Sequence, residues 1–259
     1  MFRRKARENK FLWLFVVIVS MAITNLSVYG QDDRSAAELV KGREAYLRAR
    51  TMHYNSAGTW EAINGQIEAA EAAFEKLPDG AEKFYWQGMA CFLRAEIAEV
   101  HGDKREAAAK FTESGEWAEK ALKCTDEISE VYRLLADTYL RLMNYNGILY
   151  AMGKASKAVK LLQKAVDLDA QNYLAYISLG TYYLYAPAIS GGSVDKAITM
   201  FTKALASEDE FERFSANIWL GEAYGKKKEY ETAERYLQAA LVIYPNSQWA
   251  KHTLEKYRP

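Results

Sequence analysis

The sequence has few of the residues that interrupt helices. Its 259 residues include only 4 prolines and 15 glycines, whereas 50% are hydrophobic. Proline cannot continue a helix and glycine weakens one, so their scarcity leaves room for long helices. A chain of this length and hydrophobic content can also bury a substantial core.

Cysteine is also scarce, which excludes a disulfide framework. If a turn near Gly102 folds the chain back on itself, Cys91 and Cys124 are offset by roughly 16 Å along the helices. A disulfide requires Cα atoms within about 7 Å of each other. We therefore expect two separate buried thiols.

The sequence lacks the motifs of the common catalytic and metal sites. It contains no H-E-x-x-H, G-x-S-x-G or G-x-x-x-x-G-K-[ST] motif. The three histidines, His53, His101 and His252, are scattered over separate segments, and we expect them to be exposed to solvent. Most carboxylates lie in mixed-charge runs that are typical of solvated helix faces. The sequence predicts no enzymatic activity, no cofactor and no metal site.

The first 30 residues have the pattern of a secretory signal peptide. A basic segment ending at Lys10 precedes an apolar core from Phe11 to Ile23, and Val28-Tyr29-Gly30 suits cleavage before Gln31. This pattern predicts export to a bacterial periplasm. In the alternative, residues 11–28 remain uncleaved and anchor the chain in the inner membrane.

The charge balance bears on possible partners. The chain has 34 basic and 34 acidic residues; residues 1–30 hold five basic and one acidic, so their removal leaves a net charge of −4. That balance argues against nucleic acid and against adhesion to an anionic lipid surface.

Residues 214–245 form the most regular unit of a repeat. They read Leu220-Gly221-x2-Tyr224, then Ala233-x3-Leu237-x2-Ala240 and Pro245. An earlier unit has Leu179-Gly180-x2-Tyr183, followed by Ala197-x3-Phe201-x2-Ala204. The chain thus resembles the tetratricopeptide repeat (TPR) superfamily, whose unit is a pair of antiparallel helices. Small residues stand where the two helices of a pair cross.

The resemblance implies an all-α fold, a right-handed solenoid of about five antiparallel TPR-like helix pairs with a C-terminal capping helix. Residues 31–128 carry degenerate helical pairs, and residues 129–259 carry the clearer solenoid and its cap. We expect one continuous domain over residues 31–259.

The repeats differ in the spacing between their two helices. The small residue of the first helix lies 12 positions before the alanine of the second at Gly221 and Ala233, but the matching separation is 17, 22 and 26 in the preceding three pairs. We expect the extra residues to thicken the edge where the two helices of each pair are joined, and insertions on one face often bind partners. In the alternative, the added tyrosines pack on one another.

The resemblance also implies a binding groove along the first helices of the pairs. The groove positions of the third pair include Arg133, Asp137 and Arg141. The candidate binding residues are Leu174, Ile177, Thr181, Tyr185, Pro187, Ile189, Ile218 and Glu222. We expect Leu174, Ile177, Thr181 and Ile218 to form the floor of a cleft, with the turn residues as its wall. For the apolar members, burial against a neighbouring helix is the alternative.

Three functions fit these observations. The first is an exported scaffold that binds a protein partner, such as an envelope transporter or an assembly complex. The second is a periplasmic subunit that handles a small apolar ligand, because the loop Pro187–Ser193 is similar to one in the TPR-like T component of TRAP (tripartite ATP-independent periplasmic) transporters. The third is an enzyme whose site is assembled from dispersed residues, and no catalytic motif in the sequence supports it. We expect protein partners, no nucleic acid, and membrane contact only through an uncleaved N-terminus.

Overall fold

The computed structural model describes residues 33–258, which form helices and turns without a β-strand. The helices are α2 (Asp33–Tyr54), α3 (Trp60–Glu75), α4 (Ala81–Val100), α5 (Lys104–Cys124), α6 (Ser129–Leu168), α7 (Tyr173–Tyr185), the 3-10 helix η1 (Ala188–Ser190), α8 (Val194–Ala204), α9 (Glu210–Lys226), α10 (Tyr230–Ile243) and α11 (Gln248–Lys256). Most begin at a polar residue whose side chain accepts a hydrogen bond from the first turn. These N-caps are Thr59, Asp103, Asn172, Ser193, Asp209 and Ser247.

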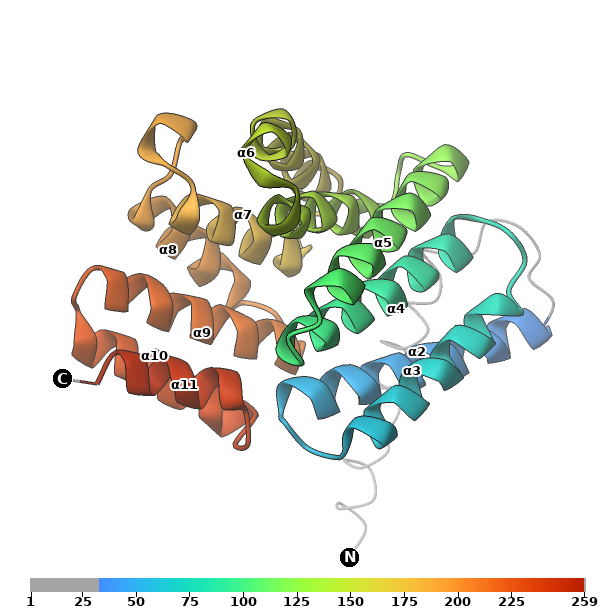
Figure 1. Cartoon of the computed structure of the whole chain (residues 1–259), viewed down its shortest axis with the longest axis horizontal. Helices are drawn as coiled ribbons and strands as arrows, with labels where there is room; N and C mark the ends of the chain where they lie inside the picture. Colours follow the sequence, from blue (N-terminus) through green and yellow to red (C-terminus); the bar gives the residue numbers. More distant parts are fainter. Residues whose placement is uncertain (1–32, 259) are drawn as a thin grey trace, which may run out of the picture.

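The helices pack as the five predicted pairs, followed by the predicted cap (Figure 1). The pairs are α2 with α3, α4 with α5, the two halves of α6, α7 with α8, and α9 with α10. Helix α6 breaks at Gly147, where φ is 73° and ψ is −175°. Its halves fold back on each other, and the Ser129 hydroxyl at the start of the first half donates to the carbonyl of Ala165 near the end of the second at 2.8 Å. Helix α11 packs on α9 and α10 and covers the end of the solenoid.

Glycines lie where the paired helices cross, as predicted. A Cβ at Gly180 would be 2.4 Å from Phe201, and one at Gly221 would be 2.5 Å from Leu237, so neither site has room for a side chain. The first pair has the same geometry, because a Cβ at Gly42 would be 2.4 Å from the ring of Phe74. Residues 33–75 are therefore a full repeat, although their sequence signature is weak.

The extra residues of the earlier pairs lengthen helices more than turns. Between α4 and α5 only residues 101–103 are non-helical, and Gly147 alone breaks α6. The extra residues of these pairs therefore extend the helices and do not form long turns. Only the fourth pair has a long connection, residues 186–193, which includes η1.

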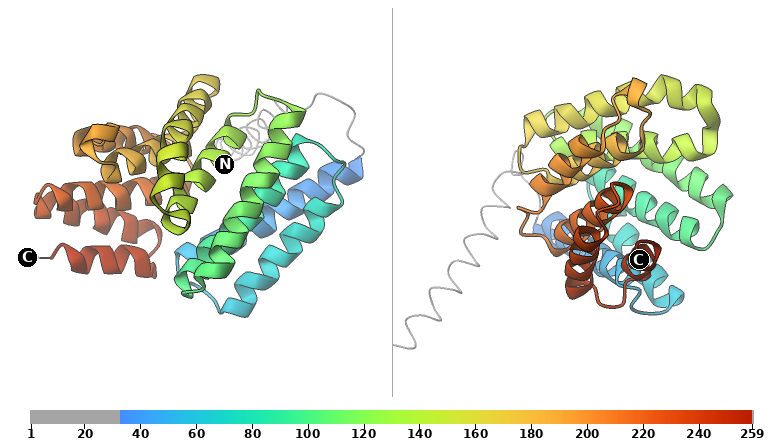
Figure 2. Two further views of the ribbon diagram at one scale, coloured as in Figure 1. Left: turned by 45° about the horizontal axis from the view of Figure 1, so that its top comes forward. Right: turned by 90° about the vertical axis from the view of Figure 1, so that its left-hand side faces the viewer.

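The solenoid closes on itself, which the repeat pattern does not predict. The C-terminal end of α2 contacts α9 and the turn before α11 (Figures 1 and 2). Arg50 binds Asp209 at 3.2 Å and lies over the ring of Phe211. Residues Asn55 and Ser56 accept hydrogen bonds from the backbone of the α10–α11 turn at 3.0 and 3.2 Å. We call this contact between the chain ends the seam.

The cysteine prediction is half correct. Cys91 and Cys124 are both free thiols, and Cys91 is buried as expected. Cys124 is exposed, because it is the last residue of α5 and lies beyond the part of the helix that packs. The prediction of burial was wrong there.

Substitution of the crossing glycine tests the pairing of α9 and α10. Gly221→Leu overpacks the contact with Leu237, so we expect it to lower the free energy of unfolding by about 1–3 kcal/mol or more. Gly65→Leu is the matched control, because a Cβ at Gly65 meets nothing within 4 Å. Thermal and urea unfolding followed by circular dichroism measure the difference. Equal stability of the two variants contradicts the helix packing.

Substitution of Arg50 tests the seam. Arg50→Ala removes the ion pair with Asp209 and the stacking on Phe211, and we expect a loss of about 1 kcal/mol. We also expect faster amide exchange at the end of α2 and the start of α9. Arg48→Ala is the control, because Arg48 is exposed and binds only Glu44 within α2. Unchanged exchange in Arg50→Ala would show that the seam does not form in solution.

Candidate functional site

A cavity of about 550 Å³ lies on the inner side of the solenoid. The first helix of every pair lines it, and α11 completes the lining. The lining residues include Tyr46, Arg50, His53 and Tyr54 of α2; Met89, Phe92, Glu96 and Glu99 of α4; Arg133, Asp137 and Arg141 of α6; Leu174, Ile177 and Thr181 of α7; Phe211, Ser215 and Trp219 of α9; and Trp249 of α11. A site to which all the repeats contribute is the strongest candidate for binding.

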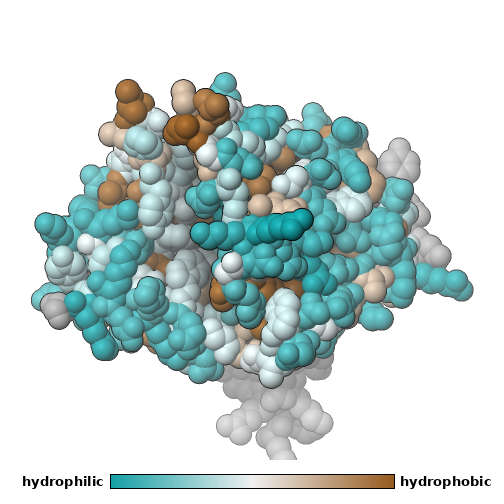
Figure 3. All heavy atoms as spheres, viewed as in Figure 1, coloured by the Kyte–Doolittle hydropathy of each residue, from teal (hydrophilic) through white to brown (hydrophobic). Residues whose placement is uncertain are grey.

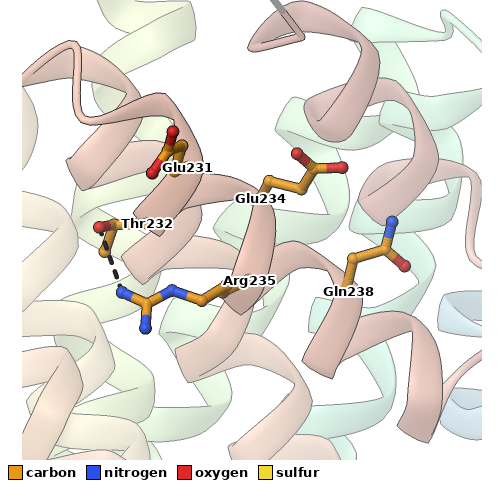
Figure 4. A pocket seen from close by; sticks show the side chains of 5 residues that line it. All are labelled: Glu231, Thr232, Glu234, Arg235 and Gln238. Carbon is orange, nitrogen blue, oxygen red and sulfur yellow. Dashed lines mark hydrogen bonds between the residues drawn. The ribbon is translucent and has the colours of Figure 1, made fainter.

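A second hollow, of about 680 Å³, is formed by α10 alone. It is lined by Glu231, Thr232, Glu234, Arg235 and Gln238, and the only bond that Figure 4 draws joins Arg235 to Thr232 at 3.3 Å. Side chains of one exposed helix do not converge on a ligand, so this surface is not a candidate site.

Aromatic rings enclose one side of the cavity at the seam. The ring of Tyr54 lies 4.6 Å from Phe211 and 6.1 Å from Trp249, measured between centroids. Trp219 meets Trp249 edge to face at 5.2 Å. These rings join α2, α9 and α11, so the seam bounds one side of the cavity.

The charged groups in the cavity are already paired with one another. Arg141 binds Glu96 at 2.8 Å and Glu99 at 3.1 Å, and Arg133 binds Asp137 at 2.7 Å. The hydroxyl of Tyr54 also donates to Glu96, at 2.6 Å. Burial raises the pKa of Glu96 and of Asp137, although the neighbouring arginines oppose it. A further charge would enter this cavity without a free partner, so the lining disfavours a charged ligand.

Two arginine nitrogens in the lining lack a hydrogen-bond partner. Among the described residues, nothing accepts a bond from the Nε atoms of Arg50 and Arg133. Arg133 is only 4% exposed, and an unpaired buried donor costs about 1–3 kcal/mol. Both atoms are shielded from solvent, so a ligand in the cavity would reach them only if the arginine side chains moved.

The structure brings three of the predicted floor residues together and separates the fourth. Leu174, Ile177 and Thr181 line the cavity on α7. Ile218 does not, because it is fully buried with Phe214 and Leu237 in the C-terminal part of the core. The expectation that it contributes to the floor was wrong: the face of α9 that carries Ile218 packs inward.

The predicted wall residues lie away from the cavity lining. Glu222 is buried and binds Lys256 at 2.7 Å, and it accepts a hydrogen bond from Tyr185 at 3.2 Å. Pro187 and Ile189 lie on the α7–α8 loop, and Ile189 is 97% exposed. The predicted cleft with these residues as its wall is therefore not one site.

The contributions of α2, α4 and α11 escaped the sequence reasoning. His53 is the clearest case, because we expected a solvated side chain and it is half-buried in the cavity wall. Burial, with the nearby His101 and Arg141, lowers its pKa to about 4. Only the seam places α2 beside α9 and α11, and no local motif specifies the seam.

Two further searches of residues 33–258 found nothing. No group of three or more His, Cys, Asp or Glu side chains is placed to hold a metal ion. Within the same range, no helix is both long and apolar enough to cross a membrane.

The depressed pKa of His53 predicts a pH dependence. The unfolded chain binds a proton near pH 6.5 and the folded chain only near pH 4, so folding stability falls as the pH drops from 6.5 to 4. This loss is no more than about 3 kcal/mol. His53→Gln should flatten the profile in this window, whereas His252→Gln, at an exposed position on α11, should not. Urea unfolding at several pH values measures it; equal profiles for both variants contradict the burial of His53.

Comparison with solved structures finds the same arrangement elsewhere. The chain is similar to TTC0263, a thermophilic TPR protein in Thermus thermophilus, with 19% sequence identity and a TM-score of 0.59 over 86% of this chain and 98% of that one. It also matches YrrB, described as a TPR protein with an unusual peptide-binding site, with 17% identity and a TM-score of 0.42 over 83% and 97% of the two chains. No family profile and no curated protein sequence matches the chain.

The comparison with the Thermus protein spans 86% of this chain and 98% of that one, and it agrees with the all-helical fold of paired helices. The chain has the fold of the tetratricopeptide repeat superfamily.

Proposed function

We propose that this chain is an interaction scaffold that binds a short, uncharged segment of a partner protein in its central cavity. The observation that carries the proposal is the cavity itself, to which the first helix of every pair contributes. Solenoid repeats generally form extended concave binding surfaces. Here the seam bounds that surface on one side and leaves a partly open cavity of about 550 Å³, which has room for a few side chains.

The lining indicates the chemistry of the bound segment. Its aromatic and aliphatic residues favour an apolar side chain, and its paired charges disfavour an ionic one. A peptide that presents an uncharged apolar or aromatic side chain meets both conditions.

The enclosure also favours a second candidate, a small apolar ligand. A volume of about 550 Å³ lies within the usual range for small-molecule sites. This candidate keeps the role of a transporter-associated subunit that handles such a ligand. Saturable binding of an apolar fluorescent probe, without binding of any peptide, would favour it over the scaffold.

We also propose that the protein works in a bacterial cell envelope, and the support for this lies in residues 1–30. Their basic segment, apolar core and small residues before Gln31 form an export signal. Expression of the full chain in a bacterium, fractionation and N-terminal sequencing test it. A periplasmic product that starts at Gln31 is expected, and a cytoplasmic product with an intact N-terminus contradicts export.

Filling the cavity tests the scaffold. Peptides are first selected against the wild-type protein from a random displayed library, and we expect them to share one or two apolar or aromatic residues. Thr181→Trp places an indole in the cavity, so it should weaken binding of these peptides at least about tenfold, or 1.4 kcal/mol. Fluorescence anisotropy with labelled peptides measures the affinity.

The matched control is Thr202→Trp, which makes the same change at an exposed position on α8. Both variants should keep the helical content of the wild type. Peptides with a common charged motif, or equal binding by both variants, would contradict a role for the cavity.

A further inference from the structure

Two apolar tips project from the molecule without cover. At the tip of α6, Ile148, Leu149 and Met152 are 73%, 82% and 73% exposed. On the α7–α8 loop Ile189 is almost fully exposed. Figure 3 shows apolar side chains gathered at the top of the view, over these two turns of Figure 1. Large apolar side chains in such a position are costly to leave in water.

The charge around the α6 tip has one sign. Residues 138–166 contain no Asp or Glu, and they contain Lys154, Lys157, Lys160 and Lys164; Arg141 is paired with Glu96 and Glu99 in the cavity. None of the four lysines forms an ion pair with a described residue. The loop adds no charge between Ala170 and Val194, and Lys196 follows it. Although the net charge of the whole chain is +0, this edge is basic and apolar.

The acidic residues nearest this edge are already engaged. Glu99 accepts a hydrogen bond from Tyr145 at 2.5 Å, and Glu119 accepts one from Tyr139 at 3.0 Å. Asp195, next to the loop, binds Lys227 at 3.1 Å. Arg141 offsets the charge of Glu99 and Lys227 offsets that of Asp195, whereas Glu119 keeps its charge beside a neutral tyrosine hydroxyl. The four unpaired lysines outnumber it on the second half of α6.

Tyrosines lie between the apolar tips and the core. Tyr145 and Tyr150 pack beside Phe111 at the base of the α6 tip, and Lys154 lies 4.1 Å above the ring of Tyr139. On the loop side, Tyr182 donates to the carbonyl of Ser190 at 2.8 Å. From the tips toward the core, the side chains are first apolar and then tyrosine and lysine. This order suits the boundary between lipid chains and headgroups.

We propose that the edge formed by the α6 tip and the α7–α8 loop docks on an anionic membrane surface. A folded protein partner would need a separate pocket for each of the two tips. A lipid bilayer is planar and deformable, so both tips can insert into it at once. The lysines complement anionic headgroups, and the tips enter the interfacial layer. The cavity and this edge are different surfaces, so the proposal does not rest on binding in the cavity.

A reporter at the tip tests the proposal in the full chain, because it measures where one residue lies whatever residues 1–30 do. Leu149→Cys in a Cys124→Ser background is labelled with a polarity-sensitive fluorophore; Cys91 is buried and does not compete. Vesicles of phosphatidylcholine with phosphatidylglycerol should shift the emission to shorter wavelength. Vesicles of phosphatidylcholine alone, or added salt, should give a weaker shift.

The matched control carries the label at Val242, which is 80% exposed on α10. It should not shift. A second reporter at Ile189→Cys measures the effect of the triple change Ile148→Ser, Leu149→Ser and Met152→Ser, which should raise the lipid concentration for half-maximal shift at least about tenfold.

Three outcomes would overturn the proposal. The probe at residue 149 could remain in water with both kinds of vesicle. It could shift no more than the probe at residue 242. It could respond only to lipid-free envelope proteins, in which case a protein partner covers the edge.

Discussion

The close crossing of two helices at a glycine determines the dimensions of this molecule. Gly42, Gly180 and Gly221 each face a large side chain of the partner helix, at a distance that leaves no room for a Cβ. The crossing fixes how closely the helices of a pair approach. The same contact occurs in the first, fourth and fifth pairs. Five pairs are enough to bring α2 back to α9 and α11.

The seam that results combines ordinary interactions in an unusual place. An ion pair, two backbone hydrogen bonds and three aromatic contacts join helices at opposite ends of the chain. None of these is strong alone, since an ion pair with an exposed partner contributes little. Together they exclude water from one side of the cavity. The site therefore owes its enclosure to contacts that no single repeat contains.

The sequence predicted what depends on neighbours in the chain. The helix pairs, the glycine crossings and the groove positions Arg133, Asp137, Arg141, Leu174, Ile177 and Thr181 follow from periodicity and repeat register. It did not predict Gly42, because the surrounding signature is degenerate. It misplaced Ile218, since the periodic pattern shows which helix face is apolar but not which neighbour covers it.

The remaining differences arise from distance along the chain. Extra residues can extend either a helix or a turn, and the comparison of repeat lengths does not show which. The outcome depends on the helix-forming residues on either side of a turn such as 101–103. The groups that act on buried His53 include His101 and Arg141, which are 48 and 88 positions away in the sequence. Local patterns carry no information about such contacts.

The seam couples the two ends of the chain. In an open solenoid each repeat contacts only its nearest neighbours, so one end can fray without disturbing the other. Here Asn55 and Asn246, 191 positions apart, share a hydrogen bond, so loss of either terminal helix releases both ends at once. Opening at either end therefore also removes part of the cavity lining, because α2 and α11 both contribute to it.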